Sequence, residues 1–290
     1  KERREKIYLS RSNSTPAFIG TGSTSIYGNV GEVDNRGVDF TIDYNKQVNK
    51  DLFVSVKGTF TYAHNEIISY DDPPYQTSPQ LSRVGHSIDQ LKMYVAEGLF
   101  TQEELDSPDT PGQTLGYIPR AGDIKYKDLN GDGKIDSNDQ MEDVGNPSVP
   151  EIVYGFGLNA EWRGFYAGIF FQGSGNTSTV LGASSNGAFF PFQWGVEESA
   201  VRSEVANRWT EQNPSQNVMF PRMHSNNFDN NTVASTWWLR DASFLRLKNV
   251  EIGYNFKEKT LKKIGIQALR VYLQGNNLCV WDDIKMWDPE

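Results

Sequence analysis

The sequence predicts an all-β fold of antiparallel strands joined by long loops, and three observations support this class. Aromatic residues make up 12% of the chain and glycine occurs 26 times, whereas apolar residues at helical spacing are scarce. This combination is typical of strands separated by many turns. Several segments alternate apolar and polar residues with a period of two, as two-faced strands do. Two long excursions, residues 65–150 and 175–236, separate these segments.

The first clear hairpin follows residues 1–36, which we expect to be irregular. Every second residue from Val38 to Tyr44 is apolar, and the residues between them are Asp or Thr. After a turn near residues 47–51, a similar alternation runs from Leu52 to Tyr62. Each segment has about the 9–11 residues that a tilted membrane strand needs.

A second hairpin is predicted for residues 152–171. Its first strand alternates from Ile152 to Trp162, and Arg163-Gly164 supplies a two-residue turn. The return strand carries apolar side chains at every second position from Phe165 to Phe171. Two alternating runs joined by so short a link are typical of an antiparallel hairpin.

A third strand pair joins residues 250–256 to residues 269–273 through the lysine-rich turn Lys257–Lys263. Leu245 and Leu247 precede the first of these strands but are out of phase with its apolar positions. An extra residue in one strand restores such a phase. The sequence therefore predicts a β-bulge near Lys248-Asn249.

The loop lengths favour a membrane barrel over a compact soluble domain. Excursions as long as residues 65–150 and 175–236 are uncommon in compact domains. Outer-membrane barrels, in contrast, have short turns on one side and long loops on the external side. If each excursion holds an even number of strand crossings, the three short turns fall on one side and both excursions fall on the other. The alternation alone also fits the core side of a soluble β-sandwich, so this alternative stays open.

Charge and composition exclude several classes of protein. The formal net charge is −9 at pH 7, which argues against nucleic-acid binding because phosphates demand a basic surface. The mean hydropathy is −0.57, and no run of about 18 apolar residues could form a membrane helix. Cys279 is the one cysteine, so the chain has no internal disulfide. We expect it to be a small buried thiol rather than a nucleophile.

Residues 128–139 have the spacing of an EF-hand calcium loop. Gly133 occupies position 6, where the chain turns sharply, and Ile135 occupies position 8. The metal ligands predicted from the spacing are side-chain oxygens at positions 1, 3, 5, 9 and 12 and the carbonyl at position 7, namely Asp128, Asn130, Asp132, Asp136, Asp139 and Lys134. The alternative is a polar surface turn that binds no metal.

Two features of this loop define its expected role. Position 12 is Asp139 instead of the usual glutamate, so bidentate capture of the ion is less certain and the affinity for calcium is expected to be lower. Neither flank has the long amphipathic helix of a calcium sensor. Calcium is therefore predicted to hold a long loop in one conformation rather than to act as a switch.

The sequence carries no catalytic motif, and we expect the protein not to be an enzyme. It has no Gly-x-Ser-x-Gly elbow, P-loop or His-Glu-x-x-His helix. His64, His86 and His224 are scattered, and each is expected to be a surface or lumen residue rather than a metal ligand.

An aromatic cluster in the second excursion has two interpretations. Aromatic rings on an external loop can stack on sugar rings, but they can also form a small hydrophobic core under the loop. We favour the small core. The cluster comprises Phe189, Phe190, Phe192 and Trp194.

Several segments together resemble one protein family. The most specific is Trp238–Val250, with the sequence WLRDASFLRLKNV, followed by Gly253-Tyr254. The other matching segments are residues 29–39, 122–128, 145–150, 164–173, 275–278 and 287–290. They resemble the C-terminal barrel portion of SusC/RagA-type TonB-linked outer-membrane proteins of Bacteroidetes, and the similarity runs from about residue 29 to the end.

This resemblance implies a plugged barrel of about 22 strands in the bacterial outer membrane. It implies import of large nutrients, glycans or peptides, with energy passed from TonB through the plug. A SusD-like surface lipoprotein is the implied partner at the external mouth, and outer-membrane lipid surrounds the barrel.

The whole chain, residues 1–290, is expected to be the C-terminal part of such a barrel. No plug domain, TonB box or final aromatic-ended strand is recognised, and about six strands are too few to close even a barrel of about 8. We therefore expect a fragment that cannot transport by itself. The alternative function is a secreted all-β module, stabilised by calcium in a dockerin-like loop, that binds carbohydrate or protein.

Overall fold

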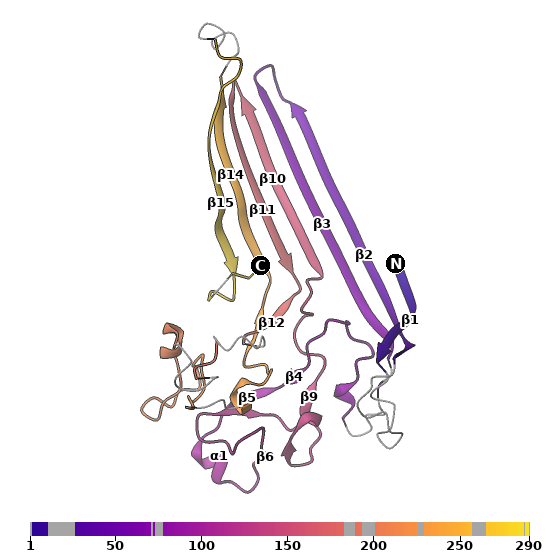
Figure 1. The fold of residues 1–290 in the computed structure, drawn as a ribbon, viewed down its shortest axis with the longest axis vertical. Coiled ribbons are helices and arrows are strands. Elements are labelled where there is room, and N and C mark those ends of the chain that lie inside the picture. The colour runs from indigo at the N-terminus through magenta and orange to yellow at the C-terminus, as the bar shows by residue number, and fades with distance from the viewer. Residues whose placement is uncertain are drawn as a thin grey trace.

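The main structural element is a seven-stranded antiparallel sheet. The computed structural model describes residues 2–10, 27–70, 72, 78–182, 189–192, 201–225, 229–256, 265–286 and 288–289. The strands follow the order β1 (Glu2–Ser10), β2 (Tyr27–Gln47), β3 (Leu52–Ser69), β10 (Ile152–Trp162), β11 (Phe165–Gly175), β14 (Phe244–Asn255) and β15 (Arg270–Asp282) (Figure 1). The predicted all-β class with antiparallel strands is confirmed.

The short turns and the long excursions lie at opposite ends of this sheet, as the sequence predicted (Figure 1). The β10–β11 turn consists of Arg163 and Gly164, with φ of 50° and 94°. Two successive positive φ values are typical of the tight turns that match the twist of paired strands. The turn predicted at Lys257–Lys263 lies outside the described residues.

The N-terminal region differs from the expectation that residues 1–36 are irregular. Strand β1 lies there, and β2 begins at Tyr27 instead of residue 37. β2 and β3 are 21 and 18 residues long, so they exceed the predicted length. The backbone ladder continues from Val38 and Tyr62 out to Glu32 and Ser69. Polar residues dominate this extension, so no hydrophobic alternation reveals it in the sequence.

The predicted bulge is confirmed at Lys248. The β11–β14 register shifts between Asn249 and Leu247, and the β14–β15 register shifts at the same place. One extra residue in a strand reverses the facing of every side chain beyond it. Leu245 and Leu247 consequently share the face of Val250.

The sheet has one apolar face and one polar face. The apolar face runs across all six long strands and includes Val38, Phe40, Phe60, Phe156, Leu158, Phe165, Ile252 and Leu273. Phe40 is 53% exposed and Phe156 is 45% exposed, while Val54 and Ile169 are partly exposed. No second sheet covers this face in the part of the chain that the structure describes. A soluble β-sandwich would bury such a face, so this alternative is disfavoured.

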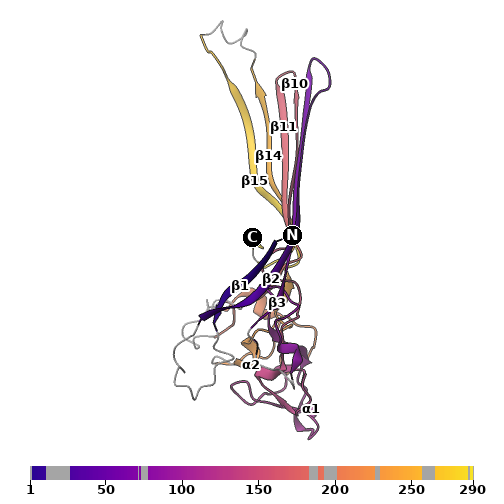
Figure 2. The ribbon, with the colours of Figure 1, turned by 90° about the vertical axis from the view of Figure 1, so that its right-hand side faces the viewer.

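The two excursions pack against each other at one end of the sheet, and we call them the loop body (Figure 2). Its strands form two-stranded sheets, which pair β12 (Ser178–Val180) with β13 (Leu239–Asp241), β4 (Met93–Tyr94) with β9 (Gln140–Met141), β5 (Ala96–Leu99) with β7 (Ile124–Tyr126), and β6 (Gly112–Gln113) with β8 (Lys134–Ile135). Short helices are α1 (Gln102–Asp106), α2 (Asp229–Thr232), η2 (Pro79–Leu81), η3 (Ser137–Asp139) and η4 (Ser203–Ala206). Among the described residues, no helix has the length and apolar character to cross a membrane.

The loop body has its own hydrophobic core. Leu99, Ile124, Phe220 and Trp238 are each no more than 2% exposed and belong to one cluster. Of the aromatic residues considered for sugar stacking, Phe189 and Phe190 are each 6% exposed and pack in the same core. This confirms the small-core interpretation for those two residues. Phe192 is partly exposed, and Trp194 lies outside the described residues.

Candidate functional site

The predicted metal loop connects β7 to β9 and turns where the motif requires it. Gly131 and Gly133 have φ of 72° and 79°, a region that glycine enters without steric cost. Ile135 at position 8 is 2% exposed and anchors the loop in the core of the loop body. Its strand, β8, pairs in parallel with β6, so the loop is held by a neighbouring segment.

The first and last carboxylates of the loop are oriented by backbone amides. Asp128 accepts hydrogen bonds from the N–H groups of Gly131 at 2.7 Å and Gly133 at 2.8 Å. Asp139 is fully buried and accepts from the N–H groups of Leu129 at 2.9 Å and Asp136 at 2.8 Å. Desolvation raises the pKa of Asp128, but the amide hydrogen bonds outweigh it and hold the pKa below the usual 3.8.

The other predicted ligands also lie within this loop. The Oδ1 atoms of Asn130, Asp132 and Asp136 accept backbone hydrogen bonds at 2.9, 2.9 and 2.7 Å. Oxygen-only donors of this kind fit a hard cation such as calcium. However, no three acidic, histidine or cysteine side chains converge as a preformed cage in the described part of the chain. The donor chemistry therefore fits calcium, whereas the ligand geometry is not assembled.

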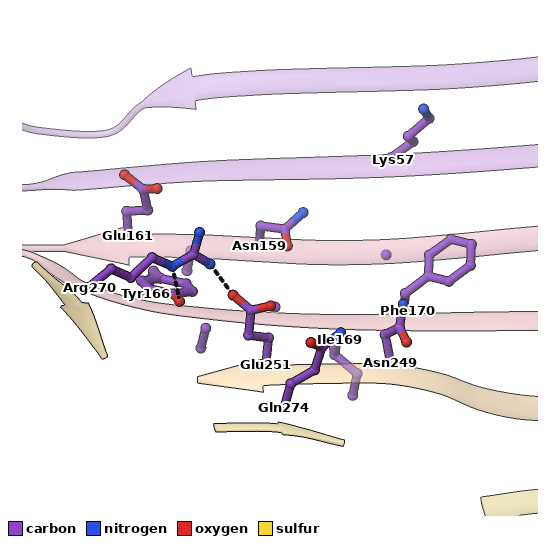
Figure 3. A pocket seen from close by; sticks show the side chains of 14 residues that line it. Lys57, Asn159, Glu161, Tyr166, Ile169, Phe170, Asn249, Glu251, Arg270 and Gln274 are labelled. Atoms are coloured by element: carbon purple, nitrogen blue, oxygen red, sulfur yellow. Dashed lines mark hydrogen bonds and ion pairs between the residues drawn. The ribbon is translucent and has the colours of Figure 1, made fainter. Parts of the chain in front are cut away.

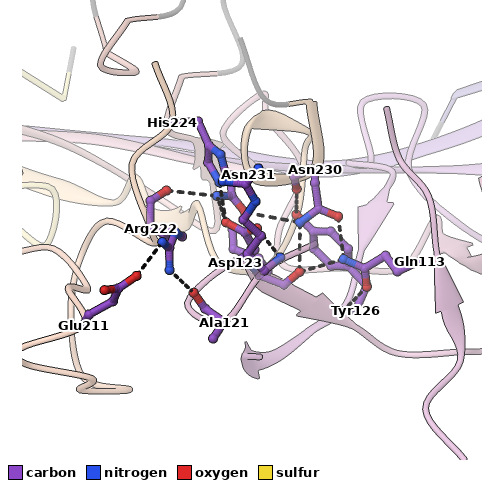
Figure 4. A network of polar contacts seen from close by, with 11 residues as sticks. Gln113, Ala121, Asp123, Tyr126, Glu211, Arg222, His224, Asn230 and Asn231 are labelled. Carbon is purple, nitrogen blue, oxygen red and sulfur yellow. Dashed lines mark hydrogen bonds and ion pairs between the residues drawn. The ribbon is translucent and has the colours of Figure 1, made fainter. Parts of the chain in front are cut away.

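A buried polar network joins the two excursions (Figure 4). Asp123 is 0% exposed, and its Oδ1 accepts hydrogen bonds from His224 Nε2 at 2.7 Å and Asn231 Nδ2 at 2.9 Å. Its Oδ2 accepts from the Arg120 N–H at 2.7 Å. The His224 side chain is 15% exposed and pairs with this buried carboxylate, a contact that the sequence did not predict. His64 and His86 lie apart, with partly exposed side chains.

Gln113 continues this network toward the metal loop. Its Nε2 donates to the Ile124 carbonyl at 2.7 Å and to Asn230 Oδ1 at 2.5 Å, and its Oε1 accepts from the Tyr126 N–H at 2.9 Å. The Tyr126 hydroxyl donates to the Asn230 carbonyl at 2.6 Å. Burial raises the pKa of Tyr126, so the phenol remains a donor at all ordinary pH values.

The polar face of the sheet contains a hollow of about 390 Å³ (Figure 3). Arg270 forms an ion pair with Glu251 and a hydrogen bond with the Tyr166 hydroxyl, and its guanidinium lies 4.3 Å from the centroid of the Tyr166 ring. The polar and aromatic side chains that line the hollow are Lys57, Asn159, Glu161, Tyr166, Phe170, Asn249, Glu251, Arg270 and Gln274. No sequence motif marks these residues. Their only sequence signal is their place at the polar positions of alternating strands.

Comparisons with curated proteins identify relatives. No family model matches the chain. The chain is 27% identical over 281 residues to the TonB-dependent receptor P3 of Formosa agariphila, covering 93% of this chain and 26% of that receptor. It is 24% identical over 312 residues to the TonB-dependent receptor SusC of Bacteroides thetaiotaomicron, covering 96% of this chain and 26% of SusC. The chain thus spans about a quarter of the length of the curated relatives it matches.

Solved structures share the fold. The structure of the RagAB peptide transporter matches with a TM-score of 0.65 at 22% identity, covering 99% of this chain and 30% of that chain. The RagAB peptide importer in its 'open-open' state matches with a TM-score of 0.65 at 23% identity, covering 99% and 29%. The fold and the sequence relatives agree with the family resemblance drawn from the motifs. The chain is thus similar in sequence to about a quarter of the length of curated TonB-dependent receptors, SusC among them, and it shares the fold of part of the RagAB structures.

Proposed function

We propose that this chain is part of an outer-membrane importer of large nutrients, either glycans or peptides, and that its function is passage rather than catalysis. The observation that supports this best is the two-faced sheet. Its apolar face is exposed, and its polar face carries a charged hollow. A membrane-spanning sheet places lipid against its apolar face and water against its polar face.

A SusD-like surface lipoprotein is the partner that we propose for the loop body. The excursions gather at one end of the sheet, opposite the short turns, as loops that meet an external partner would (Figure 1). The similarity to SusC and to the RagAB peptide transporter supports this pairing. We propose that TonB supplies the energy through a plug region, which the family resemblance implies.

Calcium is the ion that we propose for the loop Asp128–Asp139. The side-chain oxygens of Asp128, Asn130, Asp132, Asp136 and Asp139 and the Lys134 carbonyl would hold it. Bound calcium would supply positive charge to a loop rich in carboxylates. The buried side chain of Asp139 supports the proposal, because an ion there would compensate a negative charge at the base of the loop.

Localisation and uptake together test the proposed function. The full-length protein that contains this chain should sediment with the outer membrane of its native bacterium and require detergent for extraction. Deletion of its gene should abolish uptake of at least one class of labelled peptide or glycan, and re-expression should restore it. A protein secreted into the medium, with uptake unchanged by the deletion, would support the alternative of a secreted binding module.

A further inference from the structure

Both ends of the predicted calcium loop are fastened to the same segment of the first excursion, residues 93–96. Just before the loop, the Lys127 N–H donates a hydrogen bond to the Val95 carbonyl at 2.9 Å. Just after the loop, Gln140 lies opposite Tyr94 in the β4–β9 pair. A change in the conformation of the loop therefore reaches this segment through the backbone.

The same segment holds the second excursion where that excursion returns to the sheet. The Tyr94 N–H donates to the Ala234 carbonyl at 3.0 Å, and the Tyr94 carbonyl accepts from the Thr236 N–H at 3.0 Å. The Ala96 N–H donates to Thr236 Oγ1 at 2.8 Å. The segment thus lies between the calcium loop and the second excursion and is hydrogen-bonded to both.

Gln113 provides a second connection between the calcium loop and the second excursion. Its strand, β6, pairs with β8 inside the loop, and Gln113 lies opposite Ile135. The side-chain amide of Gln113 donates to Asn230 Oδ1 at 2.5 Å (Figure 4). Gln113 is 4% exposed and Asn230 is 0% exposed, so this hydrogen bond is shielded from water. Both connections therefore end in residues 229–238, which comprise α2 and lead into β13.

The six predicted ligands lie on one loop, and they share one ion only when the backbone of that loop is ordered. A ligand shifts an equilibrium toward the conformation that it binds more tightly. We infer that residues 229–238 respond to calcium in the loop Asp128–Asp139, through their contacts with Tyr94 and Gln113; the inference rests on the calcium site proposed above. Such coupling is reciprocal, so losing the contacts of residues 229–238 also weakens calcium binding.

Hydrogen exchange of the full-length protein in detergent tests this inference, and calcium itself is the probe. After metal is stripped with EDTA and the EDTA is dialysed away, added calcium should slow exchange about fivefold or more both in residues 125–141 and in residues 229–238. The β10–β11 hairpin should be unaffected. Asn230→Ala removes an acceptor of Gln113 and should raise the calcium concentration at half-maximal protection about fivefold. Asn217→Ala, the same change at an exposed position, should leave that concentration unchanged.

Three outcomes would overturn the inference and leave the proposed calcium site standing. They are protection of residues 125–141 without any change in residues 229–238, equal slowing of exchange in the β10–β11 hairpin, and equal calcium midpoints in the wild type and Asn230→Ala. If Asn230→Ala does not fold, the wild-type comparison decides on its own. If calcium protected neither segment, the proposed calcium site would fail and the inference with it. The proposed import function would be unaffected, because uptake is measured separately.

Discussion

His224 Nε2 lies 2.7 Å from Oδ1 of Asp123, although the two residues are 101 positions apart in the sequence. Asp123 belongs to the first excursion, residues 65–150, and His224 belongs to the second, residues 175–236. Because Asp123 is fully buried, its charge depends on the partners that the second excursion supplies. The packing of one excursion is thus tied to the packing of the other.

Replacement of Asp123 with alanine should loosen both excursions together. The change removes the carboxylate that accepts hydrogen bonds from His224, Asn231 and the Arg120 N–H, and each buried donor left unsatisfied costs about 1–3 kcal/mol. Hydrogen exchange of the full-length protein in detergent should rise in peptides from both excursions, while the β10–β11 hairpin stays protected. Asp109→Ala, at an exposed position, is the control. Faster exchange in the first excursion alone would contradict the coupling.

Gly122→Ala should destabilise the loop body more than the same change at Gly85. Both glycines have positive φ, 93° and 89°, so alanine at either site costs about 1–2 kcal/mol in backbone strain. An added Cβ at Gly122 would also collide with the Trp209 ring, whereas Gly85 has open space around it. Overpacking adds about 1–3 kcal/mol. Differential scanning fluorimetry should rank the two variants in this order, and equal melting temperatures would argue against the Trp209 contact.

The parts of the fold that the sequence predicts are those whose cause is local. The alternation from Val38 to Tyr44 is visible because a membrane strand must keep one face apolar along its length. The turn at Arg163-Gly164 and the spacing from Asp128 to Asp139 are likewise contained in short segments. The polar extension of β2 before Val38 is held by its backbone ladder and leaves no such pattern.

The sites that the sequence does not reveal depend on distant partners. Asp123 and His224 each look like ordinary polar residues until the fold brings them together. The hollow requires β3, β10, β11, β14 and β15 to be in register, because its walls come from all five strands. A bulge at Lys248 alters that register by one residue. The residue pattern within one strand does not show how that strand is aligned with its neighbours.

The ion pair between Glu104 and Lys125 should make stability depend on pH at both extremes. Lys125 Nζ lies 2.7 Å from Glu104 Oε1. The hydrogen bond that Lys125 donates to Glu104, together with a second one from the Thr101 N–H, lowers the pKa of Glu104 below 4.5. The same bond raises the pKa of Lys125 above 10.5. The contribution of this ion pair to the stability of the fold is therefore fully present between pH 4.5 and pH 10.5. It is lost as the pH falls through the pKa of Glu104 or rises through that of Lys125.

Lys125→Met removes this pair together with the 3.5 Å ion pair between Lys125 Nζ and Glu97 Oε2, and it leaves the Thr101–Glu104 capping box of α1 in place. The pair is partly exposed, so its loss should cost only about 0.5 kcal/mol at neutral pH. Urea unfolding of the full-length protein at a series of pH values should show a smaller loss of stability below pH 4.5 in the variant than in the wild type. Identical pH profiles would show that the pair contributes nothing.

Removal of calcium should loosen the loop body near residues 120–145 and leave the sheet intact. Chelation by EDTA would leave the carboxylates of Asp128 and Asp139 without a cation, and Asp128→Ala would remove the first ligand. Limited proteolysis should then cut this region faster, and added calcium should restore protection of the wild type but not of the variant. An unchanged cleavage pattern with and without EDTA would argue against a metal in this loop.

An arginine on the apolar face should impair membrane assembly, while an arginine at the adjacent position on the polar face should not. Phe40 is 53% exposed on the apolar face of β2, and Thr41 points to the other side. Arginine on the lipid face of a barrel costs about 2–4 kcal/mol near the bilayer centre. Phe40→Arg should therefore reduce the folded, heat-modifiable protein in the outer membrane, and Thr41→Arg should leave it near the wild-type amount. If the two variants assembled equally well, lipid would not be the medium that meets Phe40.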